Sequence, residues 1–134
     1  MIKRTLVCVA LVGLMATGSL LAHHSLAGVY DMKADKEVTG AVASVKFVNP
    51  HGSLTISVKN PDGTNTNWVF TMGSATSLAQ RNVGLTGPNA LHVGDQITVH
   101  CIPAINGSPI GFLKTVKFPD GHVVVISMGN NPNE

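Results

Sequence analysis

The segment from Val38 to Met72, VTGAVASVKFVNPHGSLTISVKNPDGTNTNWVFTM, decides the fold of this 134-residue chain. Apolar side chains alternate with polar or small ones in three runs, and each run has the two-residue period of a strand with one buried face. Asn49-Pro50-His51-Gly52 ends the first run, and Asn60-Pro61-Asp62-Gly63 has the composition of a hairpin turn. The segment therefore predicts three consecutive strands, the last two joined as a hairpin.

The chain after Met72 adds one helix and two or three more strands. Ser74 is a good helix cap, and Arg81-Asn82 ends the helical stretch. Alternating patterns separated by glycine- or proline-containing turns predict strands at 97–102, 110–118 and 122–127. This order is typical of a mainly β fold, a small five- to six-stranded Greek-key barrel of the oligonucleotide/oligosaccharide-binding (OB) type with one short helix between strands 3 and 4. An open β-sandwich is the alternative.

The N-terminal segment has the pattern of a secretory signal peptide. Lys3-Arg4 precedes an unbroken apolar stretch from Leu6 to Leu14, and small residues follow it. The apolar stretch is too short to predict a membrane span. We therefore expect residues 1–22 to be a signal peptide and the mature protein to be periplasmic or secreted, without a membrane span.

The cleavage point decides which residue begins the mature protein. Cleavage after Ala22 would make His23 the new N-terminus. Leu20 is larger than the residue preferred three positions before a cut, so cleavage after Gly18 is the alternative. The second cut would leave Ser19–Ala22 in front of the histidine.

The mature chain has the size of one domain. We assign residues 23–36 to an N-terminal arm, 37–128 to the β-barrel domain and 129–134 to a polar tail. Val29 and Tyr30 are the expected anchors of the arm, which is otherwise expected to be irregular.

Charge and cysteine content argue against a nucleic-acid partner and against an internal disulfide. The formal net charge is +2 for the whole chain, and the basic residues of the leader contribute to it, so the mature protein is nearly neutral. No basic cluster is visible, and a nucleic-acid partner is therefore not expected. Cys8 lies in the leader, so Cys101 has no partner for an internal disulfide, and we expect it to be a small buried apolar side chain.

Three histidines predict a metal site. If His23 begins the mature chain, its α-amine and imidazole form a chelating pair, and nitrogen ligands of this kind favour copper(II). His51, in a turn, supplies a third nitrogen if the arm folds back, and His24 is a fourth ligand or a neighbour of the site. This arrangement resembles the histidine brace of copper-binding exported proteins. Zinc is the second choice of metal.

The same residues permit a simpler interpretation. Two adjacent histidines at a mature N-terminus are also compatible with a solvated chain end. His51 is equally compatible with an ordinary turn in which its imidazole hydrogen-bonds a backbone carbonyl. The sequence leaves both interpretations open.

Other side chains that carry chemistry are expected to have structural or surface roles. His92 and His122 are expected at the surface. His100 and Cys101 are neighbours on a strand, so their side chains point to opposite faces and do not form a catalytic pair. A solvated patch of mixed charge is expected at Asp31, Lys33, Asp35, Lys36 and Glu37.

Short motifs in one order also resemble a known family. They are His23-His24-Ser25, Thr39–Val42, Asn49-Pro50-His51, Asn67-Trp68, Leu91 with Gly94-Asp95, and Pro119-Asp120-Gly121. This order resembles the small exported bacterial proteins of the family called domain of unknown function 6152. The resemblance implies a small periplasmic β-barrel without an established activity, and it implies no substrate. Members of the family often have a glutamate a few residues after the tryptophan. This chain has Thr71 near that position, so it departs from the family pattern there.

These features favour a binding protein over an enzyme. No nucleophile elbow, phosphate-binding loop or Cys-x-x-Cys motif occurs. We expect an exported barrel whose metal ion is bound by His23, His24 and His51. The alternative is a module that binds a small ligand or a periplasmic protein with the barrel face around Trp68, although packing beside Phe70 is the favoured role of that ring. A copper oxidase is the least favoured reading of the same residues.

Overall fold

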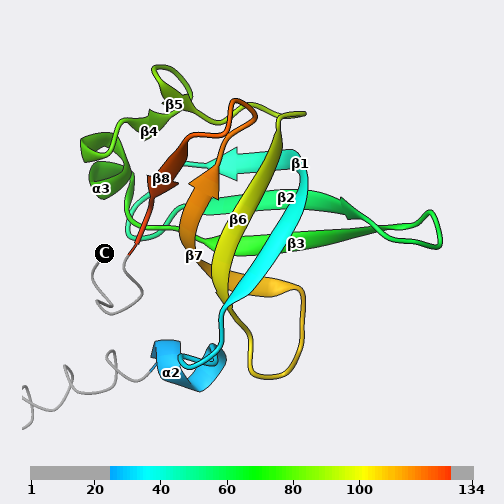
Figure 1. Cartoon of the computed structure of the whole chain (residues 1–134). Helices are drawn as coiled ribbons and strands as arrows, with labels where there is room; N and C mark the ends of the chain where they lie inside the picture. Colours follow the sequence, from blue (N-terminus) through cyan, green and yellow to red (C-terminus); the bar gives the residue numbers. More distant parts are fainter. Residues whose placement is uncertain (1–24, 128–134) are drawn as a thin grey trace, which may run out of the picture.

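The computed structural model describes residues 25–127, which form a closed β-barrel with short helices beside it (Figure 1). The expected signal peptide, His23, His24 and the tail at 129–134 lie outside the described residues. The elements are α2 (Ser25–Val29), β1 (Lys36–Lys46), β2 (Ser53–Lys59), β3 (Asn65–Thr71), α3 (Ala75–Gln80), β4 (Val83–Gly84), β5 (Asn89–Ala90), β6 (Gln96–Pro103), β7 (Ile110–Lys117) and β8 (Val123–Val125). Within this range no helix has the length and apolar content to cross a bilayer.

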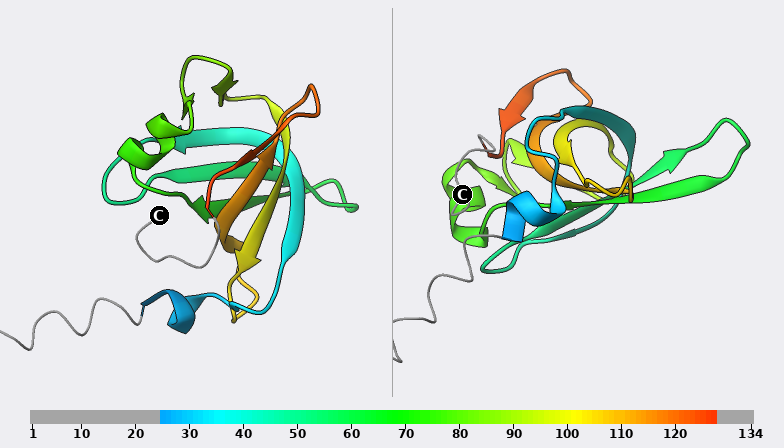
Figure 2. Two further views of the ribbon diagram at one scale, coloured as in Figure 1. Left: turned by 60° about the vertical axis from the view of Figure 1, so that its left-hand side comes forward. Right: turned by 90° about the horizontal axis from the view of Figure 1, so that it is seen from below.

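The sheet closes into a barrel through β1, β2, β3, β6 and β7. Figure 2 shows the barrel from two further sides. The order in the sheet is β3-β2-β1-β6-β7-β8, and a further pairing of β3 with β7 joins its two sides. Neighbouring strands are antiparallel except β3 and β7, which are parallel. The expected OB-like barrel is confirmed, with α3 between its third and fourth strands and β8 as an added strand. The open-sandwich alternative is wrong, because β3 and β7 pair and close the sheet on itself.

Strand β1 belongs to both sides of the barrel. Its first half pairs with β6 and its second half with β2, and Ala41 takes part in both pairings. A register shift between Val42 and Ser44 bends the strand. Gly40 lies where the backbones approach closely, because a Cβ there would be 2.5 Å from the carbonyl oxygen of Ser57. The small residues of this stretch therefore allow β1 to curve around the barrel.

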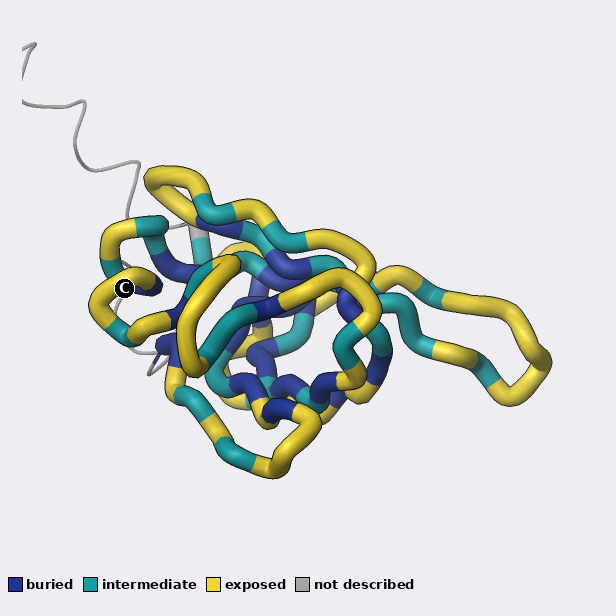
Figure 3. Tube along the Cα trace, turned by 90° about the horizontal axis from the view of Figure 1, so that it is seen from above, coloured by how far each residue is buried: buried dark blue, intermediate teal, exposed yellow. Residues whose placement is uncertain are grey.

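The inward-facing side chains form one core. Leu54 and Ile56 of β2 have no exposed surface, and Ser53, Thr55 and Ser57, which alternate with them, are partly exposed, as the alternation in the sequence predicts. Figure 3 shows the buried positions inside the barrel and the exposed β2–β3 hairpin extending beyond it. Leu78 of α3 is also fully buried, so the helix covers one end of the core. The predicted helix cap is confirmed, because the backbone N–H of Ser77 donates to Ser74 Oγ at 3.1 Å.

The structure differs from the sequence expectation at both ends of the described chain. The arm contains α2, and Val29 is 42% exposed, so its expected role as an anchor was wrong. Tyr30 is 8% exposed and is the anchor. The helix forms because Leu26 packs against the apolar cluster around Tyr30. At the other end, the strand expected at 122–127 is limited to β8, because only Thr115–Lys117 of β7 pairs with it.

The pairing of β3 with β7, which we call the seam, depends on a glycine. Its residue pairs are Val69 with Ile110, Phe70 with Gly111, and Thr71 with Phe112. A Cβ on Gly111 would lie 2.8 Å from Cys101 Sγ and 3.2 Å from Phe70 Cδ1. Both neighbours are fully buried and have little room to move. A side chain at Gly111 would therefore push the seam apart.

We expect Gly111→Ala to lower the free energy of unfolding by about 2 kcal/mol, the usual cost of forcing an extra methyl group into a packed core. Urea unfolding followed by tryptophan fluorescence measures this change. Gly28→Ala is the matched control, because a Cβ at Gly28 meets nothing within 4 Å. An unfolding midpoint for Gly111→Ala equal to that of Gly28→Ala would contradict the close approach at the seam.

Candidate functional site

The N-terminal arm is held on the outside of the seam by Tyr30. The hydroxyls of Tyr30 and Thr71 form a hydrogen bond of 2.9 Å. The Tyr30 ring contacts Phe112 edge-on, with ring centroids 6.0 Å apart. Thr71 and Phe112 are partners across the seam, so one arm side chain contacts both of the strands that close the barrel.

Backbone hydrogen bonds also fix the arm. The N–H of Asp31 donates to the carbonyl of Pro103 at 2.9 Å, and the N–H of Ile105 donates to the carbonyl of Val29 at 3.0 Å. Residues on both sides of Tyr30 are thus tied to the end of β6 and to the chain that follows it. The arm has a defined position on the barrel from α2 onward.

His51 lies in the turn between β1 and β2, beside the segment that leads into α3. The N–H of Gly52 donates to the carbonyl of Gly73 at 3.0 Å, and the N–H of Met72 donates to the carbonyl of Gly52 at 2.9 Å. The Asn49–Pro50 peptide bond in this turn is cis. His51 is exposed, and within residues 25–127 no hydrogen bond or ion pair joins its imidazole to another group. The carbonyl contact considered for this imidazole is therefore not observed in the described chain.

The arm and the His51 turn are connected indirectly, through the end of β3. Thr71, which binds the Tyr30 hydroxyl, is paired with Ser53 at the start of β2. Ser53 follows the turn directly in the chain. We call the region formed by Tyr30, Thr71, Ser53 and the Asn49–Gly52 turn the arm corner.

Of the three predicted metal ligands, the structure describes His51. His23 and His24 directly precede α2 and lie outside the described residues. Within residues 25–127 there is no group of three or more His, Cys, Asp or Glu side chains that could hold a metal ion. A metal site at the arm corner therefore depends on ligands from the chain before α2.

Two other histidines each face a carboxylate. His92 is exposed, as expected, and its Nδ1 is 3.5 Å from Asp95 Oδ2. His122 is less exposed than the sequence suggested, because its ring stacks on Phe118 with centroids 4.4 Å apart. The backbone and side-chain hydrogen bonds that His122 donates lower the pKa of the Asp120 carboxyl. These contacts order two surface turns.

A charge cluster joins the arm to β6 and β7. His100 Nδ1 is 3.2 Å from Asp35 Oδ2, and His100 Nε2 is 3.1 Å from Glu37 Oε2. Lys114 Nζ is 3.0 Å from Asp35 Oδ1, and this hydrogen bond lowers the pKa of the Asp35 carboxyl. The two carboxylates face opposite nitrogens of one ring, so they do not converge on a common metal ion. Sequence reasoning identified the acidic residues and missed His100 and Lys114, because only the register of β1 on β6 reveals these partners.

Trp68 contributes to the core. It is half-buried on the inner side of β3, and its ring stacks on Phe70 with centroids 6.0 Å apart. Lys36 Nζ lies 5.5 Å from the centroid of the Trp68 ring. The predicted packing beside Phe70 is confirmed. The side chains that alternate with the buried ones on β2 and β3 include no aromatic ring to stack a ligand: Ser53, Thr55, Ser57, Lys59, Asn65, Asn67, Val69 and Thr71.

Cys101 is the free cysteine of the described chain and is fully buried. Burial raises the pKa of its thiol to about 11. The thiol is therefore protonated at neutral pH and is neither a nucleophile nor a ready metal ligand. The expected structural role of Cys101 is confirmed, since its sulfur packs over Gly111 at the seam.

The fold and the arm corner define a small closed β-barrel of the OB type with an N-terminal arm docked on its seam. The chain belongs to the family of unknown function DUF6152, whose sequence model matches residues 10–114. The resemblance inferred from short motifs is thereby confirmed, although the match ends before the Pro119–Gly121 turn. No curated protein and no solved structure matches the chain.

We expect Tyr30→Phe and Thr71→Val each to lower the free energy of unfolding by about 1 kcal/mol, because each removes one partner of the same hydrogen bond. A double-mutant cycle measured by urea unfolding tests the pairing. The double variant should be no less stable than the worse single variant. Fully additive losses would contradict a direct bond between the two hydroxyls.

Proposed function

We propose that the protein is an exported barrel that binds a metal ion, copper(II) in preference to zinc, at the arm corner. Cleavage after Ala22 removes residues 1–22 and leaves His23 at the mature N-terminus. His23, His24 and His51 are the proposed ligands. The protein captures the ion without a catalytic step, in a role such as copper tolerance, delivery or storage in the periplasm or outside the cell.

The chemistry of the proposed ligands favours copper(II). An N-terminal histidine offers its α-amine and an imidazole nitrogen in one chelate ring, and copper(II) prefers nitrogen ligands in a near-planar arrangement. The His51 imidazole would supply the third nitrogen. Zinc binds the same ligand types, but it prefers a tetrahedral arrangement that a planar chelate and one further imidazole satisfy less well.

The observation that carries the proposal is the hydrogen bond between Tyr30 and Thr71. It fixes the arm beside the strand end that is paired with the start of β2, directly after the His51 turn. With α2 helical, the chain from Tyr30 back to His23 spans at most about 15 Å. On the barrel side, a strand spacing of about 5 Å and two further residues separate Thr71 from His51. These two lengths are similar, so the chain before α2 is long enough to approach the turn if it folds back toward it.

The exposure of His51 also supports the proposal. The turn is tied on both sides of Gly52 to Met72 and Gly73, so the imidazole projects from an ordered backbone. An exposed imidazole without a competing hydrogen bond in the described chain has a low cost for binding a metal. The exposed His92, which already faces Asp95, provides a natural comparison.

Copper(II) titration of the secreted protein, followed by electron paramagnetic resonance, tests the ligand set. We expect one tightly bound ion with a nitrogen-rich spectrum, and we expect His51→Ala to weaken binding by about tenfold or more and to change the spectrum, since one inner ligand is lost. His92→Ala is the matched control and should leave both unchanged. Spectra and affinities identical between His51→Ala and wild type would exclude His51 as a ligand.

The intact mass of the same preparation identifies its first residue. A mass that corresponds to a start at His23 supports the chelating N-terminus. If the protein starts at Ser19, its α-amine is four residues from His23, and the amine and the His23 imidazole cannot form one chelate ring. That result would contradict the proposed site, whatever the metal affinity of the sample.

A further inference from the structure

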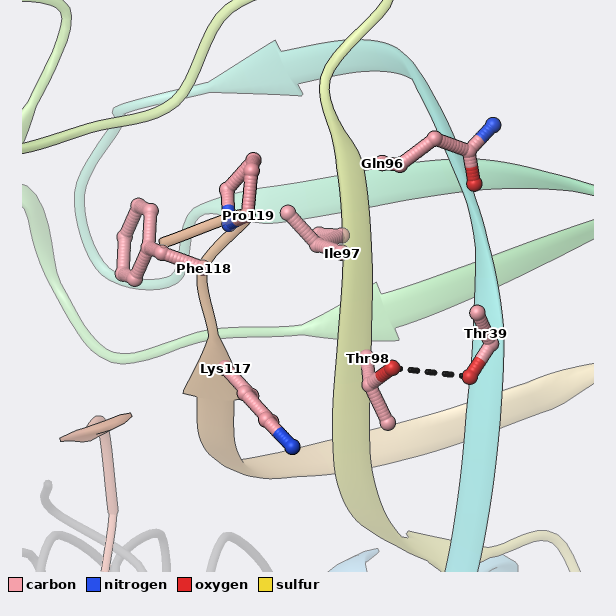
Figure 4. Close-up of a pocket in the computed structure, with 7 residues that line it drawn as sticks. All are labelled: Thr39, Gln96, Ile97, Thr98, Lys117, Phe118 and Pro119. Atoms are coloured by element: carbon pink, nitrogen blue, oxygen red, sulfur yellow. Dashed lines mark hydrogen bonds between the residues drawn. The ribbon is translucent and has the colours of Figure 1, made fainter. Parts of the chain in front are cut away.

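A groove lies on the outer surface of β1, β6 and β7 (Figure 4). Its volume is about 290 Å³, which suits a ligand of a few heavy atoms. It is lined by Thr39, Gln96, Ile97, Thr98, Lys117, Phe118 and Pro119. None of these residues belongs to the arm corner, so the groove is a separate surface.

The strand register places three polar side chains of the groove in one row. Thr39 of β1 is the partner of Thr98 of β6, and Thr98 is the partner of Lys117 of β7. Directly paired residues on neighbouring strands project from the same face of a sheet. The two hydroxyls and the ammonium group are therefore presented together, as Figure 4 shows.

The threonine pair keeps a hydrogen-bond donor available. The hydroxyls of Thr39 and Thr98 are 2.8 Å apart and either can donate to the other. Each hydroxyl has one hydrogen, so whichever one accepts keeps its own O–H for a third group. The Gln96 amide lies at the other end of the groove and is directed away from Lys117, as Figure 4 shows. The groove thus offers a hydroxyl donor next to a positive charge.

The charge of Lys117 is not balanced by a neighbour in the described chain. No ion pair or hydrogen bond within residues 25–127 involves its ammonium group, whereas Lys114 on the same strand is paired with Asp35. The nearest acidic residue in sequence, Asp120, faces the backbone N–H and the ring of His122. The lining itself contains no carboxylate.

We propose that this groove binds a small oxyanion, with a carboxylate or phosphate head group held by Lys117 and one threonine hydroxyl. A single positive charge beside a neutral donor matches a head group of this class. The exposed Pro119 provides a small apolar wall at one end for a short hydrocarbon part of the ligand. This inference is independent of the copper proposal, because it shares no residue with the arm corner.

Amide chemical shifts of the ¹⁵N-labelled protein, recorded during titration with inorganic phosphate and separately with butyrate at constant ionic strength, test the groove. We expect saturable shifts at Thr39, Thr98 and Lys117, with millimolar affinity for a site this open. Saturation with both anions supports recognition of the shared head group. Saturation with butyrate alone indicates that the apolar wall is needed, and saturation with phosphate alone identifies a free phosphate site.

Matched variants distinguish specific binding in the groove from nonspecific attraction of an anion to lysine side chains. Lys117→Met and Thr98→Val should each weaken binding about tenfold, as expected for loss of a charge-assisted hydrogen bond. Lys59→Met and Thr55→Val, on the outer face of β2, should leave the affinity unchanged. Absence of saturation with either anion, or equal effects of the Lys117 and Lys59 substitutions, would overturn the proposal.

Discussion

Closure of the barrel by three parallel residue pairs between β3 and β7 is the constraint on which both the core and the arm depend. On the inside of this seam, Gly111 lets Phe70 and Cys101 pack against the β7 backbone. On the outside, Thr71 and Phe112 present a hydroxyl and a ring side by side, and Tyr30 contacts both. A sheet left open between β3 and β7 would lose the core contact and the docking point of the arm together.

The seam also explains why the proposed metal site lies where it does. The arm is fixed at the end of β3, and the pairing of β3 with β2 places the His51 turn next to that end. The charge cluster of Asp35, Glu37, His100 and Lys114 then holds the following residues of the arm against β6 and β7. The groove around Lys117 is a separate surface of the same barrel.

Much of this architecture was predictable from the sequence, because it depends on patterns within a few neighbouring residues. The alternation around Leu54 and Ile56, the Asn60–Gly63 hairpin turn and the Ser74 cap each act within a few residues, and each was predicted correctly. The parallel contact of β3 with β7 was not predictable in detail, since it joins residues about forty positions apart.

The same distinction holds for the sites. The turn that carries His51 was predicted because it is a local feature, whereas the role of His51 as a metal ligand stays a prediction. Tyr30 was predicted as an anchor, and its burial confirms this. The partners Thr71, His100 and Lys114, and the row that ends at Lys117, arise only from strand register, which a single sequence specifies weakly. Val29 was misassigned because α2 turns its side chain to solvent.

Paramagnetic broadening by copper(II) tests most directly the central proposal, that His23 and the His51 turn share one metal site. The ion is added stoichiometrically to the His51→Ala variant, so that the N-terminal chelate alone holds it. Broadening of the amide signals of residues 49–53 and 71–74, with those of the hairpin at 60–64 spared, is the result that a docked arm predicts. Broadening that spares the turn, or that is uniform over the barrel, would contradict it.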